Sequence, residues 1–110
     1  MEKNLKTKSD EIELNENQLL KLRNITIDKE KKQVTLTSRI LTLPRNEFEI
    51  LCFLASQPEK IITRDEIYQH VWGNEVVGLR NVDMHIRKLR EKLGKNHIET
   101  ITKLGYKFME

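Results

Sequence analysis

The sequence predicts an α+β fold in which short strands come first, three helices follow and a hairpin ends the chain. Apolar and polar residues alternate from Leu20 to Leu43, a pattern typical of half-buried strands. Apolar residues then recur at helical spacing between Pro44 and Gly94, and a second alternating stretch follows. Strands, helix, helix, loop, helix and hairpin form the order of a winged helix-turn-helix, which we place in one domain over residues 19–110.

Residues 1–18 are polar, mix both signs of charge and contain no aromatic residue. We therefore expect a disordered linker or arm there, with room for a short strand near Ile12–Leu14. An N-terminal stretch of this kind suggests a fragment cut from a longer protein at a linker.

The alternating region is expected to form three or four short antiparallel strands with one covered face. Its apolar pairs are Ile25/Ile27, Val34/Leu36 and Leu41/Leu43. The polar segments Asp28–Lys32 and Thr37–Arg39 between these pairs are expected to be turns.

Two helices are expected next. The first opens at Pro44, whose fixed φ suits a first helical turn, and ends at Gln57-Pro58. The segment Thr63-Arg64-Asp65-Glu66 is a capping box, because the Thr63 hydroxyl and the Glu66 carboxylate can each accept from the other's backbone N–H. The second helix therefore begins after Thr63 and ends at Gly73, a C-cap residue.

The third helix, residues 80–93, has two opposed faces. An apolar stripe of Val82, Ile86, Leu89 and Leu93 must face a core. The opposite side carries Arg80, Met84, Arg87, Lys88 and Glu91, with Asn81 and His85 on one flank. Six Lys or Arg and two acids between Arg80 and Lys95 give this segment a net charge of +4, whereas the whole chain has +3. Such a helix is anchored on one side and cationic on the other.

A hairpin ends the chain. We expect strands at Ile98–Thr102 and Tyr106–Met109, joined by Lys103-Leu104-Gly105. Gly105 suits the left-handed position of a three-residue loop.

A basic helix that follows another helix across a loop predicts binding to double-stranded DNA. Asn81 can pair with adenine edges, and Met84 can meet a thymine methyl group. An α-helix fits the major groove of B-DNA but not the deep, narrow groove of A-form RNA, and no aromatic platform for single strands is evident. A protein-interaction module and an RNA-binding winged helix are the alternatives.

Asp83 in this helix and Trp72 before it have two interpretations each. Asp83 lies four residues before Arg87 and can pair with it, either as a plain intrahelical pair or to orient the guanidinium. Trp72 either packs in the core or donates its indole N–H to a phosphate. His85 is interpreted as a phosphate contact.

Other classes of protein and of site are excluded by composition. No apolar run approaches the ~18 residues of a membrane span and no signal peptide is evident, so a cytoplasmic location is expected. Cys52 lies in an apolar run, which favours a small buried hydrophobic side chain over a reactive thiol. The three histidines and Cys52 match no zinc template, and no nucleophile–base pair is present, so neither a metal, a cofactor nor an enzyme is expected.

Five motifs together resemble a known family. They are Glu47-Phe48-Glu49-Ile50-Leu51, Thr63-Arg64-Asp65-Glu66-Ile67, His70-Val71-Trp72-Gly73, the run from Arg80 to Leu93, and Gly105-Tyr106-Lys107-Phe108. The chain from about Leu20 to Phe108 resembles the effector domain of bacterial OmpR/PhoB-type response regulators. This resemblance implies a four-stranded N-terminal sheet, three helices and a hairpin wing, with the third helix in the major groove and the wing at the adjacent minor groove.

The resemblance also implies roles for individual residues. Lys88 and Asn81 would face bases, and Thr100 would make a backbone contact at the wing. Phosphates would be held at Trp72, Arg80, His85, Arg87 and Arg90. The loop Asn74, Glu75, Val76, Val77, Gly78 and Leu79 matches the segment that can contact RNA polymerase in family members.

Two departures from the family pattern stand out. Thr102, followed by Lys103, replaces the wing arginine common in the family, so a phosphate contact is retained and minor-groove insertion is in doubt. Pro44 replaces a helix-capping threonine, which should alter only the helix start.

Whole proteins of this kind carry an N-terminal receiver domain, whose aspartyl phosphorylation by a sensor histidine kinase promotes dimerisation. The resemblance therefore implies tandem binding to direct repeats and recruitment of RNA polymerase. We expect the isolated domain to be a monomer that pairs only on DNA.

Overall fold

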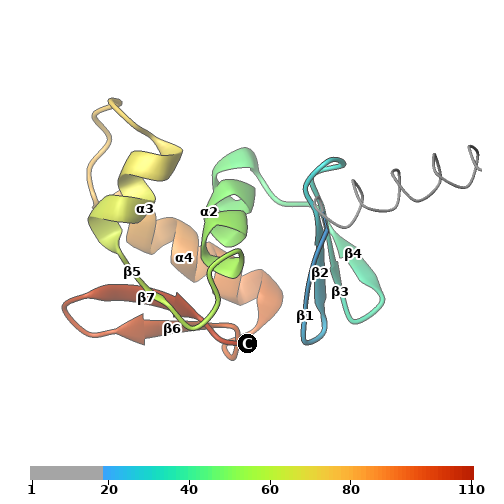
Figure 1. The fold of residues 1–110 in the computed structure, drawn as a ribbon. Helices are drawn as coiled ribbons and strands as arrows, with labels where there is room; N and C mark the ends of the chain where they lie inside the picture. The colour runs from blue at the N-terminus through green and yellow to red at the C-terminus, as the bar shows by residue number, and fades with distance from the viewer. Residues whose placement is uncertain (1–18) are drawn as a thin grey trace, which may run out of the picture.

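The computed structural model describes residues 19–110, and the strand considered near Ile12–Leu14 lies outside them, as does the expected linker. Two sheets flank a group of helices (Figure 1). The elements run β1 (Leu19–Leu22), β2 (Ile25–Asp28), β3 (Gln33–Leu36), β4 (Arg39–Leu41), α2 (Arg45–Ala55), β5 (Ile61–Thr63), α3 (Arg64–Val71), α4 (Arg80–Leu93), β6 (Ile98–Ile101) and β7 (Gly105–Phe108). The predicted α+β winged helix-turn-helix is confirmed.

The N-terminal sheet pairs its four strands in chain order, each antiparallel to the next. Ile25, Ile27 and Val34 are completely buried, and Leu36 nearly so, whereas their neighbours along β2 and β3 are partly exposed. The buried side chains join the same apolar core as the helices. The alternation in the sequence therefore predicted the covered face correctly.

Local signals set the limits of α2 and α3. Pro44 is the N-cap of α2, and its carbonyl accepts the first helical hydrogen bond from the Phe48 N–H. At the start of α3, the Thr63 Oγ1 accepts from the Glu66 N–H at 3.0 Å and the Glu66 Oε1 accepts from the Thr63 N–H at 2.8 Å. The capping box is thus confirmed. Gly73 follows the end of α3 with a φ of +60°, as a helix-terminating glycine does.

The C-terminal sheet has three strands in the order β5-β7-β6, so the hairpin gains a partner that the sequence did not predict. The left-handed residue of the turn is Lys103, with a φ of +68°, and not Gly105. Gly105 instead pairs with Thr63, and a Cβ on it would lie 2.1 Å from the Ile62 carbonyl oxygen. The prediction for Gly105 was wrong in its reason. A glycine is needed there because β5 lies too close for any larger side chain, and not because of the turn.

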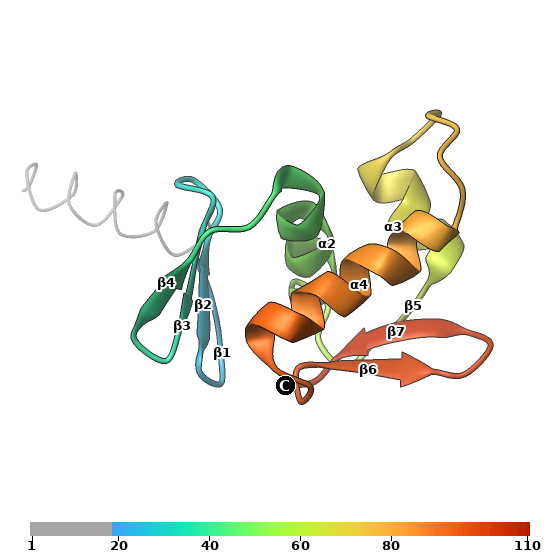
Figure 2. The same ribbon diagram turned by 180° about the vertical axis from the view of Figure 1, so that it is seen from behind.

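Helix α4 crosses the molecule beside α2, with β6 and β7 running below it (Figure 2). Val82, Ile86 and Leu89 are completely buried and Leu93 is 4% exposed, which confirms the apolar stripe. Because this stripe holds one side of α4 in the core, the other side is left to face outward.

Candidate DNA interface

The outer side of α4 carries three exposed cations, Arg80, Arg87 and Lys88. Two grooves follow this side of the helix. One, of about 460 Å³, is lined by Arg80, Asn81, Asp83, Met84 and Arg87. The other, of about 550 Å³, runs between α4 and β6 and has Arg87 and Arg90 in its wall. Arg87 therefore stands between two concave surfaces, the second of which is also lined by Lys95 and by the acids Glu91 and Glu99.

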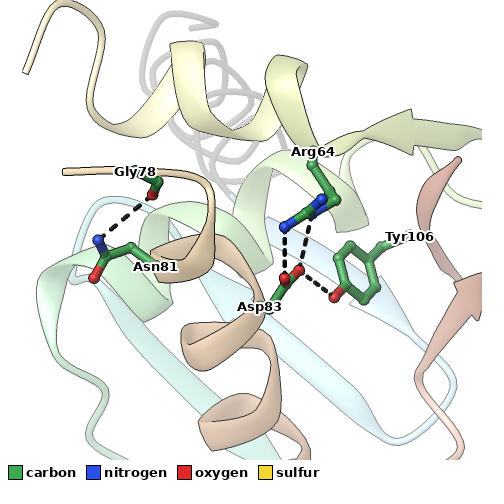
Figure 3. A network of polar contacts seen from close by, with 5 residues as sticks. All are labelled: Arg64, Gly78, Asn81, Asp83 and Tyr106. Atoms are coloured by element: carbon green, nitrogen blue, oxygen red, sulfur yellow. Dashed lines mark hydrogen bonds and ion pairs between the residues drawn. The ribbon is translucent and has the colours of Figure 1, made fainter. Parts of the chain in front are cut away.

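Asp83 does not pair with Arg87. Its carboxylate takes a two-point ion pair from Arg64 at the start of α3, with Nη2 at 2.7 Å and Nε at 3.1 Å (Figure 3). The Tyr106 hydroxyl donates to the same carboxylate at 2.7 Å. The intrahelical pair was a wrong prediction, because the fold brings in a guanidinium from another helix that four-residue spacing cannot reveal. Within residues 19–110, Arg87 makes no ion pair and is free for an outside anion.

Tyr106 is 8% exposed and packs beneath this ion pair. Burial, together with the hydrogen bond to Asp83, raises the pKa of the Tyr106 hydroxyl to about 12. The phenol therefore stays protonated and donates to Asp83 throughout the neutral range.

Arg90 joins α4 to the wing. Its Nε and Nη2 donate to the Ile98 carbonyl at 3.1 and 2.9 Å, and Nη2 also donates to the Thr100 hydroxyl at 2.7 Å. The guanidinium carbon lies 5.6 Å from the centre of the Tyr106 ring. Arg90 and Thr100 are thus engaged with each other, and their contacts with DNA stay predictions.

Asn81 is engaged with the loop that precedes α4. Its amide Nδ2 donates to the Val77 carbonyl. It also donates, at 3.5 Å, to the Gly78 carbonyl (Figure 3). The side chain therefore closes the loop against the first turn of the helix. Its amide oxygen makes no hydrogen bond within residues 19–110, and base contact through it stays a prediction.

Trp72 and His85 pack together between the helices. Trp72 is 8% exposed, and its ring stacks on His85 with the ring centres 5.5 Å apart. The His85 side chain is 14% exposed, and its Nδ1 lies 4.0 Å from Oε2 of the buried Glu47. Desolvation, partly opposed by Glu47, lowers the pKa of His85, so the ring is neutral at pH 7. Trp72 follows the core-packing interpretation, and phosphate contacts by either residue stay predictions.

The loop Asn74–Leu79 is held by hydrogen bonds to Tyr68 on α3. The Tyr68 hydroxyl donates to the Glu75 carbonyl and accepts from the Val77 N–H at 2.9 Å. Val76 is 97% exposed and Val77 42% exposed. An apolar side chain therefore stands in solvent on a loop whose backbone is fastened at two points. The sequence offered no sign of this role for Tyr68.

The wing tip is open to solvent. Thr102 and Lys103 are exposed, and Leu104 is 55% exposed. The tip therefore adds a second cationic point beyond the end of the groove between α4 and β6.

Nothing in the described part of the chain suggests catalysis or metal binding. No group of three or more His, Cys, Asp or Glu is arranged to hold a metal ion within residues 19–110. Cys52, predicted to be buried, is only partly buried and packs against the core, and this burial raises the pKa of its thiol to about 11. Among these residues, no helix has the length and hydropathy to cross a membrane.

Arg64 and Tyr106, like Tyr68, are site residues for which the sequence predicted no role. Both lie in motifs that the sequence displays, Arg64 in the capping box and Tyr106 in the Gly-Tyr-Lys-Phe string. A charged residue in a first helical turn and a tyrosine in a strand are common, however, so neither points to a shared carboxylate.

Comparison with known proteins agrees with this geometry. Residues 37–108 match the family described as "Transcriptional regulatory protein, C terminal". The transcriptional regulatory protein VxrB of Vibrio cholerae is 46% identical over 85 residues, which cover 76% of this chain and 35% of VxrB. The chain spans between 35% and 44% of the length of the curated relatives it matches.

Two solved structures share the fold. The response regulator DrrB, a Thermotoga maritima OmpR/PhoB homologue, superposes with a TM-score of 0.77 at 32% identity, covering 84% of this chain and 45% of DrrB. The Klebsiella pneumoniae RstA DNA-binding domain, solved in complex with the RstA box, has a TM-score of 0.74 at 30% identity, covering 83% of this chain and 96% of that domain.

Proposed function

The chain belongs to the family of C-terminal domains of transcriptional regulatory proteins, which are DNA-binding domains and not enzymes, and from this premise we propose how it reads a duplex. Helix α4 enters the major groove of B-form DNA with its cationic side. The wing lies beside the neighbouring minor groove. The observation that carries this proposal is the division of α4 into a buried stripe and an exposed row of cations.

The exposed residues of α4 divide into two kinds of contact. Lys88 reads base edges, with Asn81 and Met84 nearer the start of the helix. Arg80 and Arg87 neutralise phosphates and release counterions. Arg87 suits this role because it is exposed and has no internal acid partner within residues 19–110.

The wing and the base of α4 complete the footprint. Thr102 and Lys103 meet the backbone at the minor groove. His85 and Arg90 on α4, with Trp72 and Thr100 beside the helix, would meet phosphates with their remaining polar edges. Because Arg90 and Thr100 already bond to each other, their contribution is expected to be smaller than that of the open cations.

The loop Asn74–Leu79 is proposed to contact RNA polymerase. Its exposed Val76 and Val77 supply the apolar area that a protein partner can bury, and Tyr68 keeps the loop ordered. In the full-length protein, an N-terminal receiver domain phosphorylated by a sensor histidine kinase would promote pairing on direct repeats. The isolated domain is then a monomer that dimerises on DNA, in the cytoplasm.

The experiment is a salt titration of binding to a random-sequence duplex and to a duplex selected by the domain from a random pool. We expect tighter binding to the selected duplex and a steep fall in affinity with salt for both. Little affinity without a salt slope would instead identify a protein-interaction module. Preference for duplex RNA in competition would identify an RNA-binding winged helix.

A further inference from the structure

One carboxylate joins three elements of the fold. Asp83, in the first turn of α4, accepts two hydrogen bonds from Arg64, the first residue of α3. It also accepts from Tyr106 in the middle of β7 (Figure 3). Asp83 therefore ties the helix-turn-helix pair to the wing at a single point. Hydrogen bonds to an ionised carboxylate are directional, so this link sets an orientation as well as a distance.

Arg90 provides a second link between α4 and the wing. Seven residues along the helix correspond to about 10 Å, so Asp83 and Arg90 reach the wing from two separate points on α4. Arg90 binds Ile98 and Thr100 on β6, and its guanidinium lies over the Tyr106 ring. Thr100 pairs with Tyr106 across the hairpin, so both links meet in the same part of the wing. The links start from separate points on α4 and reach different strands, β6 through Arg90 and β7 through Asp83, so together they fix the angle between the helix and the wing.

Beyond the pairing of β5 with Gly105 and Tyr106, the tip of the wing has no strand partner outside the hairpin among the described residues. Ile98 and Phe108 at its base are buried, whereas Thr102, Lys103 and Leu104 at its tip are exposed. The direction of the tip relative to α4 therefore depends on contacts in the middle of the wing.

Resting on the proposed function, we infer that Arg64, Asp83, Tyr106 and Arg90 are positioning residues for DNA binding, hereafter the Asp83 network. They hold the wing at a fixed angle to α4, so that the helix and the wing tip reach the duplex together. Ordering the wing before binding removes an entropy cost from association. The Asp83 carboxylate, neutralised by Arg64, is also kept from repelling phosphates.

A double-mutant cycle between Tyr106→Phe and Lys103→Ala tests this inference. Tyr106→Phe keeps the ring and removes the hydroxyl that donates to Asp83. Affinity is measured for the duplex selected by the wild-type domain from a random pool. We expect Lys103→Ala to weaken binding by about threefold or more in the wild-type background and by less than about twofold in the Tyr106→Phe background. Equal losses in both backgrounds would overturn the inference.

Loss of stability is separated from loss of positioning by a matched control. Ile27→Val destabilises the N-terminal sheet, far from the wing, so it lowers the melting temperature without touching the Asp83 network. In that background Lys103→Ala should keep its full effect. A reduced effect of Lys103→Ala in the Ile27→Val background would show that the cycle reports stability alone, and this result would overturn the inference.

Amide hydrogen exchange of the free domain gives a readout that needs no DNA. Arg90→Lys keeps the charge but removes the planar fork, and we expect faster exchange in β6 and β7 with unchanged exchange in β2 and β3. Unchanged exchange in the wing would overturn the inference. A wild-type domain that binds no duplex would instead overturn the proposed function, while the exchange result would still show whether the wing is held.

Discussion

Lys92 on α4 forms an ion pair with Glu47 on α2, with Nζ 2.7 Å from Oε1 of a side chain that is 2% exposed. The other polar neighbour of this carboxylate, Nδ1 of His85, is 4.0 Å away, beyond hydrogen-bond distance. Lys92 is therefore the main counter-charge for an acid enclosed in the core, and it fastens α4 to α2.

Lys92→Ala should destabilise the domain by about 1–3 kcal/mol, because it leaves the Glu47 carboxylate buried without a partner. The free energy of unfolding in urea measures this effect. Lys21→Ala, at an exposed position on β1, is the control and should lie within about 0.5 kcal/mol of wild type. Adding Glu47→Gln to Lys92→Ala should recover part of the loss. Equal stability of the two lysine variants would contradict the proposed role of the ion pair.

Lys88→Ala and Arg87→Ala should affect DNA binding in different ways. Loss of a base contact at Lys88 should weaken binding to the selected duplex by ~1–3 kcal/mol and relax its sequence preference. Loss of a phosphate contact at Arg87 should weaken binding to all duplexes alike and reduce the salt slope by about one unit. Equal losses on selected and random duplexes for Lys88→Ala would refute its base-reading role.

The stability of the domain should fall as the pH drops below 6.5. Desolvation lowers the pKa of both His85 and His97 below their ordinary value of 6.5. Between the unfolded and folded pKa values the unfolded chain binds more protons, so acid favours unfolding. Urea unfolding at about pH 7.5 and about pH 5.5 measures this difference. His97→Gln should make the free energy of unfolding less dependent on pH. A steeper loss of stability in this variant than in the wild type would show that His97 is not a source of the pH dependence.

Gly105→Ala should separate β5 from β7. The added Cβ would lie 2.1 Å from the Ile62 carbonyl oxygen and 2.8 Å from the Thr63 Cα, both of them backbone atoms. We expect a loss of about 1–3 kcal/mol in the free energy of unfolding. Gly78→Ala is the matched control, since Gly78 has a φ of +90° but open space around it. A larger loss for Gly78→Ala would mean that backbone strain outweighs the strand contact.

Tyr68→Phe should loosen the loop Asn74–Leu79 without changing DNA affinity. The variant loses the hydroxyl that bonds to Glu75 and Val77 but keeps the ring beside Trp72. We expect transcription from a cognate promoter to fall in a reconstituted assay while binding to the selected duplex is unchanged. Full transcription by the variant would argue against polymerase contact through an ordered loop.

The features that the sequence predicted correctly all depend on neighbours within a few residues. The Thr63–Glu66 capping box spans three residues, and the stripe from Val82 to Leu93 repeats along one helix. Period-two alternation likewise marked β2 and β3. Such patterns can be recognised in consecutive residues because helices and strands repeat their geometry every few residues.

Chain segments far apart in the sequence account for what the patterns did not predict. Asp83 bonds to Arg64 and Tyr106, which are 19 and 23 residues away, although an arginine four residues along its own helix was available. Strand β5 is too short to show alternation, and its pairing with β7 is what requires a glycine at position 105. The sequence by itself determined the helices, strands and caps, because these depend on neighbouring residues. Only the tertiary structure decided which side chain or strand pairs with which, because packing of the core brings distant segments such as Arg64 and Asp83 together.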